Sequence, residues 1–196
     1  KNYNLELFES SFTSDLLGFV SIAFLFLITL LVALRWRDIS KIIFVALFVR
    51  IGLMLAGHYF FHLPDSTNDA LGFEWGAWDM AKDGFINTLK NYPGANSFFY
   101  SWMIAIPYSL FGRSILMMQS IGLLFGLGVV FFGWLITKKI WGEQAAIKVG
   151  WILALFPSLI LYSIIPLREV YNSFFLIVAM LGIVNWAKTK NLQSLF

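Results

Sequence analysis

The stretch "LLGFVSIAFLFLITLLVAL", residues 16–34, contains no charged side chain and only two hydroxyl groups. About 20 apolar residues are enough to carry a helix through the hydrocarbon core of a bilayer. Three further uncharged runs of similar length follow, at residues 114–137, 149–167 and 170–187. A fifth run, residues 42–63, contains a single charge, Arg50. These runs predict an all-α fold, a polytopic membrane helix bundle with about five spans.

The composition supports a membrane protein and excludes several other classes. Of the 196 residues, 59% are hydrophobic and 13% are charged, whereas roughly a quarter of a soluble domain is charged. The net charge of +3 gives no case for nucleic-acid binding, which requires a clustered basic face. The chain has no cysteine, which excludes disulfides, thiolate catalysis and cysteine-ligated zinc.

Charge also decides how the spans alternate. Residues 97–111 are apolar but short and contain Pro107, which suits a re-entrant or interfacial helix better than a full span. If this segment does not cross, one side receives eight basic residues, Arg35, Arg37, Lys41, Lys138, Lys139, Lys148, Lys188 and Lys190. Nine of the eleven acidic residues then lie on the other side, and this bias disappears if the segment crosses. The positive-inside rule therefore predicts five spans with the N-terminus outside.

This topology divides the chain into three parts. Residues 1–13 form an extracytoplasmic N-terminal segment, and residues 14–187 form one transmembrane module whose extracytoplasmic loop, residues 64–113, follows the membrane surface. Residues 188–196 are a cytoplasmic tail or the start of a continuation. The chain does not begin with Met, and "NLQSLF" begins a new apolar turn at its end, so we expect a longer parent protein.

The stretch "HLPDSTNDALGFEWGAWDMAKDGF", residues 62–85, gathers almost half of the carboxylates, namely Asp65, Asp69, Glu74, Asp79 and Asp83. A helix over 68–84 would place small and acidic residues on one stripe, with Asp69 at its start. The helix dipole there favours the ionised carboxylate, and a fixed, ionised carboxylate can act as a general base. The alternative is that Asp69 only caps the helix and that the other acids are solvated.

Other polar side chains near the membrane are open to two interpretations. His58 and His62 lie one helical turn apart and could bind a metal ion with Asp65 and Asp69, although histidines at a membrane boundary need no metal. Arg50 lies about 12 Å into its span at 1.5 Å per residue, so it lines a functional cavity or reaches back to the headgroups.

The segment "PLREVYN", residues 166–172, separates two spans by almost nothing. The topology places Arg168 and Glu169 on the same side as Asp69. A charged pair wedged between two apolar helices is either used by the protein or closes the turn as a salt bridge.

Three stretches together resemble a known superfamily. They are "NDALGFEWGAWDMAKDG" (68–84), "YPGANSFFYSWMIAIPYSLFGRS" (92–114) and "TKKIWGEQAAIKVGWILALFPSLILYSIIPLREVYNSFFL" (137–176). In order and spacing they resemble the GT-C membrane glycosyltransferases over about residues 42–187. The most similar branch is that of the protein-mannosyltransferase-like and lipid-A aminoarabinose transferase-like enzymes. Where the latter carry Lys-Pro, this chain has Tyr92-Pro93 with Lys90 nearby.

The resemblance implies the amino-terminal portion of an inner (plasma) membrane enzyme of the bacterial cell envelope, with membrane-parallel helices in its first loop. Such an enzyme moves a sugar from a polyprenyl phosphate to a glycan, lipid or protein acceptor, with inversion. Asp69 would be the catalytic base and Glu169 a second catalytic carboxylate, and no cofactor is required unless a divalent cation (Mg²⁺ or Mn²⁺) binds. The candidate donor-phosphate ligands are Arg168, Lys90, Arg113 and Arg50, and the tryptophans that contact the sugar or anchor the loop are Trp75, Trp78 and Trp102.

Two other functions stay open at this stage. A non-catalytic GT-C-like module could scaffold a larger membrane complex, and it would tolerate loss of Asp69 and Glu169. A transporter of lipid-linked sugars would carry polar residues and broken helices near the midplane, and Arg50 is the only charge within the five runs. The enzyme hypothesis requires that Asp69 and Glu169 share one cleft.

Overall fold

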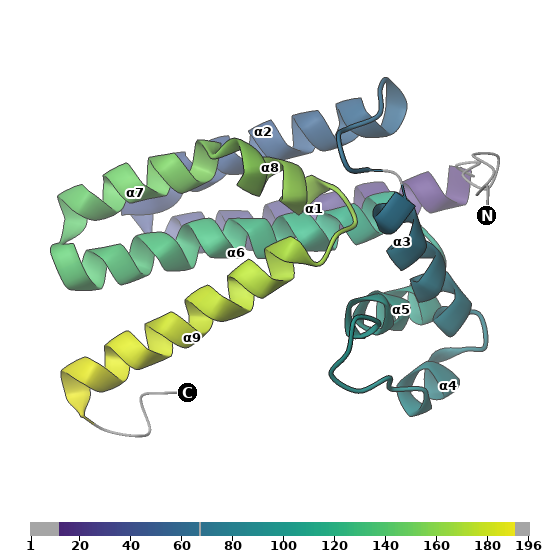
Figure 1. The fold of residues 1–196 in the computed structure, drawn as a ribbon. Coiled ribbons are helices and arrows are strands. Elements are labelled where there is room, and N and C mark those ends of the chain that lie inside the picture. Colours follow the sequence, from purple (N-terminus) through teal and green to yellow (C-terminus); the bar gives the residue numbers. More distant parts are fainter. Residues whose placement is uncertain (1–11, 67, 191–196) are drawn as a thin grey trace.

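Every regular element in the described residues, 12–66 and 68–190 of a computed structural model, is a helix. In lipid the backbone N–H and C=O groups must be paired within the segment itself, so uncharged runs fold as helices. Their bounds are α1 (Phe12–Arg35), η2 (Arg37–Ile39), α2 (Ser40–Tyr59), α3 (Asn68–Ala81), α4 (Phe85–Lys90), α5 (Phe99–Phe111), α6 (Ile115–Trp141), α7 (Glu143–Leu155), α8 (Pro157–Ile164) and α9 (Glu169–Thr189). The predicted all-α membrane bundle is confirmed in this coarse sense (Figure 1).

Four segments are long and apolar enough to cross a membrane: α1, η2 with α2, α6 and α9. The run at 149–167, predicted as one span, is instead divided between α7 and α8, which meet at a bend of 54°. Pro157 is the first residue of α8, and its ring removes an N–H and disfavours helical geometry at the preceding Phe156. Counted together, α7 and α8 would be a fifth span.

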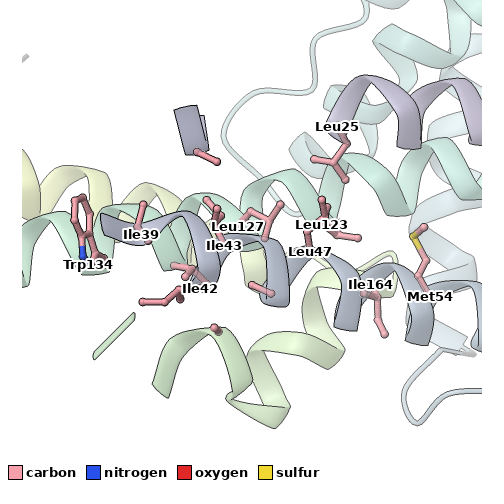
Figure 2. Close-up of a cluster of buried hydrophobic side chains, with 14 of the residues drawn as sticks. Leu25, Ile39, Ile42, Ile43, Leu47, Met54, Leu123, Leu127, Trp134 and Ile164 are labelled. Atoms are coloured by element: carbon pink, nitrogen blue, oxygen red, sulfur yellow. The ribbon is translucent and has the colours of Figure 1, made fainter. Parts of the chain in front are cut away.

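The core of the bundle is built around α6. Most of its span is buried, whereas α1 and α9 bury far less of theirs. Leu123, Leu127 and Trp134 of α6 pack against Ile43 and Leu47 of α2 in one cluster (Figure 2). The outer helices therefore present apolar side chains outward, as lipid contact requires.

Small residues let the helices approach closely. A Cβ on Gly18 of α1 would lie 2.3 Å from the Cβ of Leu116, and one on Gly126 of α6 would lie 2.4 Å from the Cβ of Ser163. Lipid tails are as apolar as leucine, so helices in a membrane gain from such close packing rather than from leaving water. Gly126 thereby fixes α8 tightly against α6.

The connections collect at two opposite ends of the bundle (Figure 1). At one end, the ammonium of Lys138 lies 2.5 Å from the carboxylate of Asp38, and Lys188 donates to the backbone carbonyl of Lys139. At the other end lie α3, α4 and α5, together with the turn between α8 and α9. The fold thus brings the long acidic connection and the short 165–168 turn to the same end.

The three loop helices pack on one another and on the start of α6. Ala77 and Ala81 of α3 face Tyr100 and Ile104 of α5 in a second buried cluster. The helix predicted over 68–84 ends at Ala81, and the chain turns into α4 at Gly84, whose φ of 90° favours glycine. The predicted segments 1–13 and 188–196 lie mostly outside the described residues.

Candidate functional site

A cavity of about 370 Å³ lies between the beginning of α3 and the turn that precedes α9. Its lining comes from two parts of the chain about a hundred residues apart: Asp65, Asp69 and Phe73 from one, and Tyr162, Leu167, Arg168 and Glu169 from the other. Four of these seven side chains carry formal charge. The cavity therefore combines charged groups with two aromatic rings at the end of the bundle where the loop helices gather.

The acidic wall is shaped by the loop that enters α3. Asp65 has a φ of 59°, a left-handed conformation that Asp adopts more readily than most residues. Next to it, the Ser66 hydroxyl donates to the carbonyl of Leu63 at 2.6 Å. Asp69 lies in the first turn of α3, where the helix dipole favours a negative charge. Phe73, one turn further, lies on the same face of α3, so both residues line the cavity.

The opposite wall is a short connection held in place by its own backbone. The N–H of Leu167 donates to the carbonyl of Ile165 at 2.8 Å, and the N–H of Asn172 donates to that of Arg168 at 3.1 Å. Glu169 begins α9, so this carboxylate also lies at a helix N-terminus. Ile165 and Leu167 are buried, whereas Arg168 and Glu169, which follow them, are exposed and line the cavity.

The charges around the cavity are not neutralised by one another. Within the part of the chain that the structure describes, no salt bridge joins Arg168 to Glu169, Asp69 or Asp65. The Arg168 guanidinium instead lies 5.6 Å from the ring centroid of Phe73, which is within cation–π distance. A turn-closing salt bridge between Arg168 and Glu169 is therefore absent there, and all four groups are exposed.

Arg113 is used elsewhere. Its Nε and Nη2 donate to the two carboxylate oxygens of Glu74 at 2.9 and 2.7 Å, and the Tyr108 hydroxyl donates to Glu74 Oε1 at 3.1 Å. The hydrogen bonds to Glu74 raise the pKa of Arg113, and burial raises the pKa of Tyr108 well above its usual value. This cluster joins α3 and α5 to the residues just before α6, away from the cavity lining.

Glu74 is the residue that sequence reasoning passed over. The sequence assigned it no role beyond that of one more acid in the loop, which the alternative interpretation treats as solvated, but it is 1% exposed. Its position contained a signal, because Ala70 and Ala77 lie one turn before and after it on the same buried face of α3. A carboxylate in the middle of a small-residue face needs a buried partner, and Arg113 supplies it.

The other candidate donor ligands do not line this cavity. Arg50 is fully buried in α2, where it donates to Ser163 and to backbone carbonyls. Lys90 is exposed at the end of α4.

The three candidate tryptophans lie on the loop helices. Trp75 is exposed, Trp78 lies 5.9 Å from the Arg113 guanidinium, and Trp102 donates to the carbonyl of Thr88 at 2.7 Å. None of the three is among the residues that line the cavity.

The proposed metal ligands are divided between two places. His58 Nε2 lies 3.9 Å from Asp15 of α1, and the Tyr59 hydroxyl donates to the same carboxylate at 3.1 Å. His62 is exposed in the loop, whereas Asp65 and Asp69 line the cavity. Among residues 12–66 and 68–190, no three His, Asp or Glu side chains come together as a group that could hold a metal ion.

Comparison of the chain with protein-family models, with curated proteins and with solved structures found no match. A function for this protein therefore has to be argued from the residues of its cavity and from the sequence pattern that surrounds them.

Proposed function

We propose that this protein is an integral membrane glycosyltransferase of the GT-C type. It would move a sugar from a polyprenyl-phosphate-linked donor to an extracytoplasmic acceptor hydroxyl, with inversion at the anomeric carbon. The observation that carries this proposal is the single cavity shared by Asp69, Arg168 and Glu169. The sequence pattern predicts only that these three residues lie on the same side of the membrane, and the enzyme hypothesis requires that they share one cleft.

The size and place of the cavity suit a sugar phosphate with a lipid tail. About 370 Å³ lies within the range of small-ligand sites, roughly 300 to 1,000 Å³. The cavity lies where the apolar helices end, so a polyprenyl chain can stay in the bilayer while its headgroup enters. Phe73 and Tyr162 provide ring surfaces against which a sugar can pack.

The chemistry needs one base and one cation. The Asp69 carboxylate removes the proton of the acceptor hydroxyl as its oxygen attacks the anomeric carbon. The bond from that carbon to the phosphate oxygen breaks, and its electron pair leaves with the polyprenyl phosphate. Arg168 offsets the charge that develops on the phosphate, while Glu169 contacts the sugar or orients Arg168.

The test is Asp69→Asn in the full-length protein, assayed in membranes with polyprenyl phosphates carrying mannose, glucose or aminoarabinose. Loss of a general base lowers the transfer rate by about 10² to 10⁴. Asp79→Asn is the matched control, since Asp79 lies on the same helix but pairs with Lys82 at the surface. Wild-type rates in Asp69→Asn would remove Asp69 from the mechanism. If the wild-type protein transfers none of these sugars, the scaffold hypothesis is favoured.

The divalent-cation option is tested in the same assay. If an ion is required, EDTA abolishes transfer and Mg²⁺ or Mn²⁺ restores it. If the transfer rate is unchanged by EDTA, the positive charge of Arg168 is the main counter-charge for the leaving phosphate.

A further inference from the structure

Arg50 is buried in the bundle without a charged partner among the described residues. Its guanidinium donates only to neutral groups: Nη1 to the carbonyls of Ala46 (3.2 Å) and Ala154 (2.8 Å), Nη2 to the carbonyl of Leu153 (3.4 Å), and Nε to the hydroxyl of Ser163 (3.1 Å). No ion pair explains its presence there, so the explanation has to come from those acceptors.

Two of the acceptors are the carbonyls that the break between α7 and α8 leaves unpaired. The carbonyl of Leu153 would normally accept from the residue four positions later, which is Pro157 and has no N–H. Ala154 precedes the same bend, where Phe156 takes an extended conformation. Unpaired carbonyls are strongly disfavoured inside a membrane. Arg50, reaching across from α2, supplies the missing donors.

The same guanidinium also holds α8, on the far side of the break. The Ser163 hydroxyl accepts from Arg50 Nε and donates to the carbonyl of Ile160 at 2.7 Å. From the other side, Ser163 packs against Gly126, where a Cβ would lie 2.4 Å away. One side chain therefore joins the end of α7 to the last turn of α8.

From Ser163 the chain reaches the cavity with little freedom to adjust. Tyr162, its immediate neighbour, lines the cavity. After Ser163, the buried residues 164–167 lead directly to Arg168 and Glu169. The direction of α8 thus sets where both charged groups point.

We propose that Arg50 is a positioning residue: by pairing the open carbonyls of α7 and holding Ser163 of α8, it sets the orientation of Tyr162, Arg168 and Glu169 toward Asp69. The kinetic test of this positioning role rests on the proposed function, because it measures sugar transfer. The geometric part holds for whatever ligand the cavity binds.

Three variants separate capping from positioning. Arg50→Met removes every bond, and Arg50→Lys keeps the charge but has a single nitrogen, which cannot reach α7 and Ser163 together. Ser163→Ala keeps the cap on α7 and removes only the link to α8. Ser120→Ala is the matched control, because Ser120 is buried in α6 and donates only to the carbonyl of Leu116 in its own helix.

The geometric readout is the distance between spin labels in the full-length protein without substrate. The 196 residues contain no cysteine, so Gly72→Cys and Asn172→Cys introduce the only labelled thiols within them. Both positions are exposed, and a Cβ on Gly72 meets no atom within 4 Å. We expect Arg50→Met and Ser163→Ala to shift and broaden the distance distribution between α3 and α9, with Arg50→Lys intermediate and Ser120→Ala unchanged.

In the transfer assay, Arg50→Met should lower kcat about a hundredfold, as misplacement of reacting groups by about 1 Å does. Ser163→Ala should lower kcat about tenfold, the loss of one hydrogen bond, with KM little changed. If the Arg50→Met protein does not fold in the membrane, the Ser163→Ala variant alone tests the positioning role. A distance distribution in Ser163→Ala identical to that in Ser120→Ala would overturn the proposal. If the wild-type protein transfers no sugar, the proposed function fails and the distance measurement still decides the role of Arg50.

Discussion

Helix α3 contributes carboxylates to two sites with opposite character. Glu74 is 1% exposed and is bound by Arg113 and Tyr108. Asp69, little more than one turn earlier, is exposed and lines a cavity with Arg168. At the first site each charge has a partner. At the second, oppositely charged groups surround an open volume without forming a salt bridge within the described residues.

The difference teaches which acid is free to act on a ligand. A buried carboxylate has to be paired, because an unpaired buried charge is far more costly than an exposed one. Glu74 is therefore committed to holding α3 against α5 and α6. The cavity charges can stay unpaired because they remain open to solvent, and their interactions are available to a substrate. Substitution at the first site should change stability, and substitution at the second should change activity.

The largest effect on the free energy of unfolding is expected for Glu74→Ala. It leaves the Arg113 guanidinium partly buried without its carboxylate, which costs about 3 kcal/mol. Unfolding in detergent micelles measures this loss, and Glu74→Ala combined with Arg113→Met should recover part of it. Asp69→Ala, the control on the same helix, should cost about 0.5 kcal/mol. Equal losses in the two single variants would contradict the distinction between the sites.

A smaller loss is expected for Tyr108→Phe. The change removes the hydroxyl that donates to Glu74 but leaves the pair with Arg113 in place. One buried hydrogen bond contributes about 1 kcal/mol. The same unfolding measurement applies, and a loss as large as that of Glu74→Ala would mean that Tyr108 rather than Arg113 holds the carboxylate.

The pH dependence follows from the raised pKa of Tyr108. Burial comes first and the neighbouring Glu74 second in raising it well above 10.0. The unfolded chain therefore loses this proton at lower pH than the folded protein does. Stability from Tyr108 should be constant below about pH 10, the ordinary tyrosine value, and should fall as pH rises further. Melting temperatures measured between pH 8 and 11.5 check this prediction. If the melting temperature of Tyr108→Phe falls with rising pH as much as that of the wild-type protein, the prediction is wrong.

The smallest effect on stability is expected at the cavity. Arg168→Gln removes an exposed charge with no salt bridge among the described residues, so the free energy of unfolding should change by less than about 0.5 kcal/mol. If the protein is the glycosyltransferase proposed above, sugar transfer should nevertheless fall, because the departing phosphate loses its counter-charge. Strong destabilisation by Arg168→Gln would place Arg168 with Arg113 as a structural residue.

Much of the fold could be predicted because membrane helices follow composition. Long apolar runs located α1, α2, α6 and α9, and alternation of the spans put the acidic loop and the 166–172 segment at one end. The run 149–167 was predicted as one span and is bent at Pro157, because hydrophobicity alone does not show where a helix bends. The composition of a segment predicts whether it contacts lipid or water. It does not predict where the helix bends or which helices pack against it.

The site was predictable only in part. Asp69, Arg168 and Glu169 stood out because charges beside long apolar runs are rare. The pairing of Glu74 with Arg113 joins residues far apart in the chain. It depends on the rotational phase of α3 and on the path through α5, neither of which the local sequence determines.

The bend between α7 and α8 has a consequence for how the protein is made. Neither helix is long enough to span a bilayer alone, and Arg50 donates to the carbonyls of Leu153 and Ala154 at the joint between them. Because α2 precedes α7 in the chain, Arg50 is synthesised first and can already be in the membrane when the broken span emerges. The order of translation thus places the Arg50 guanidinium in the chain before the α7 carbonyls to which it donates.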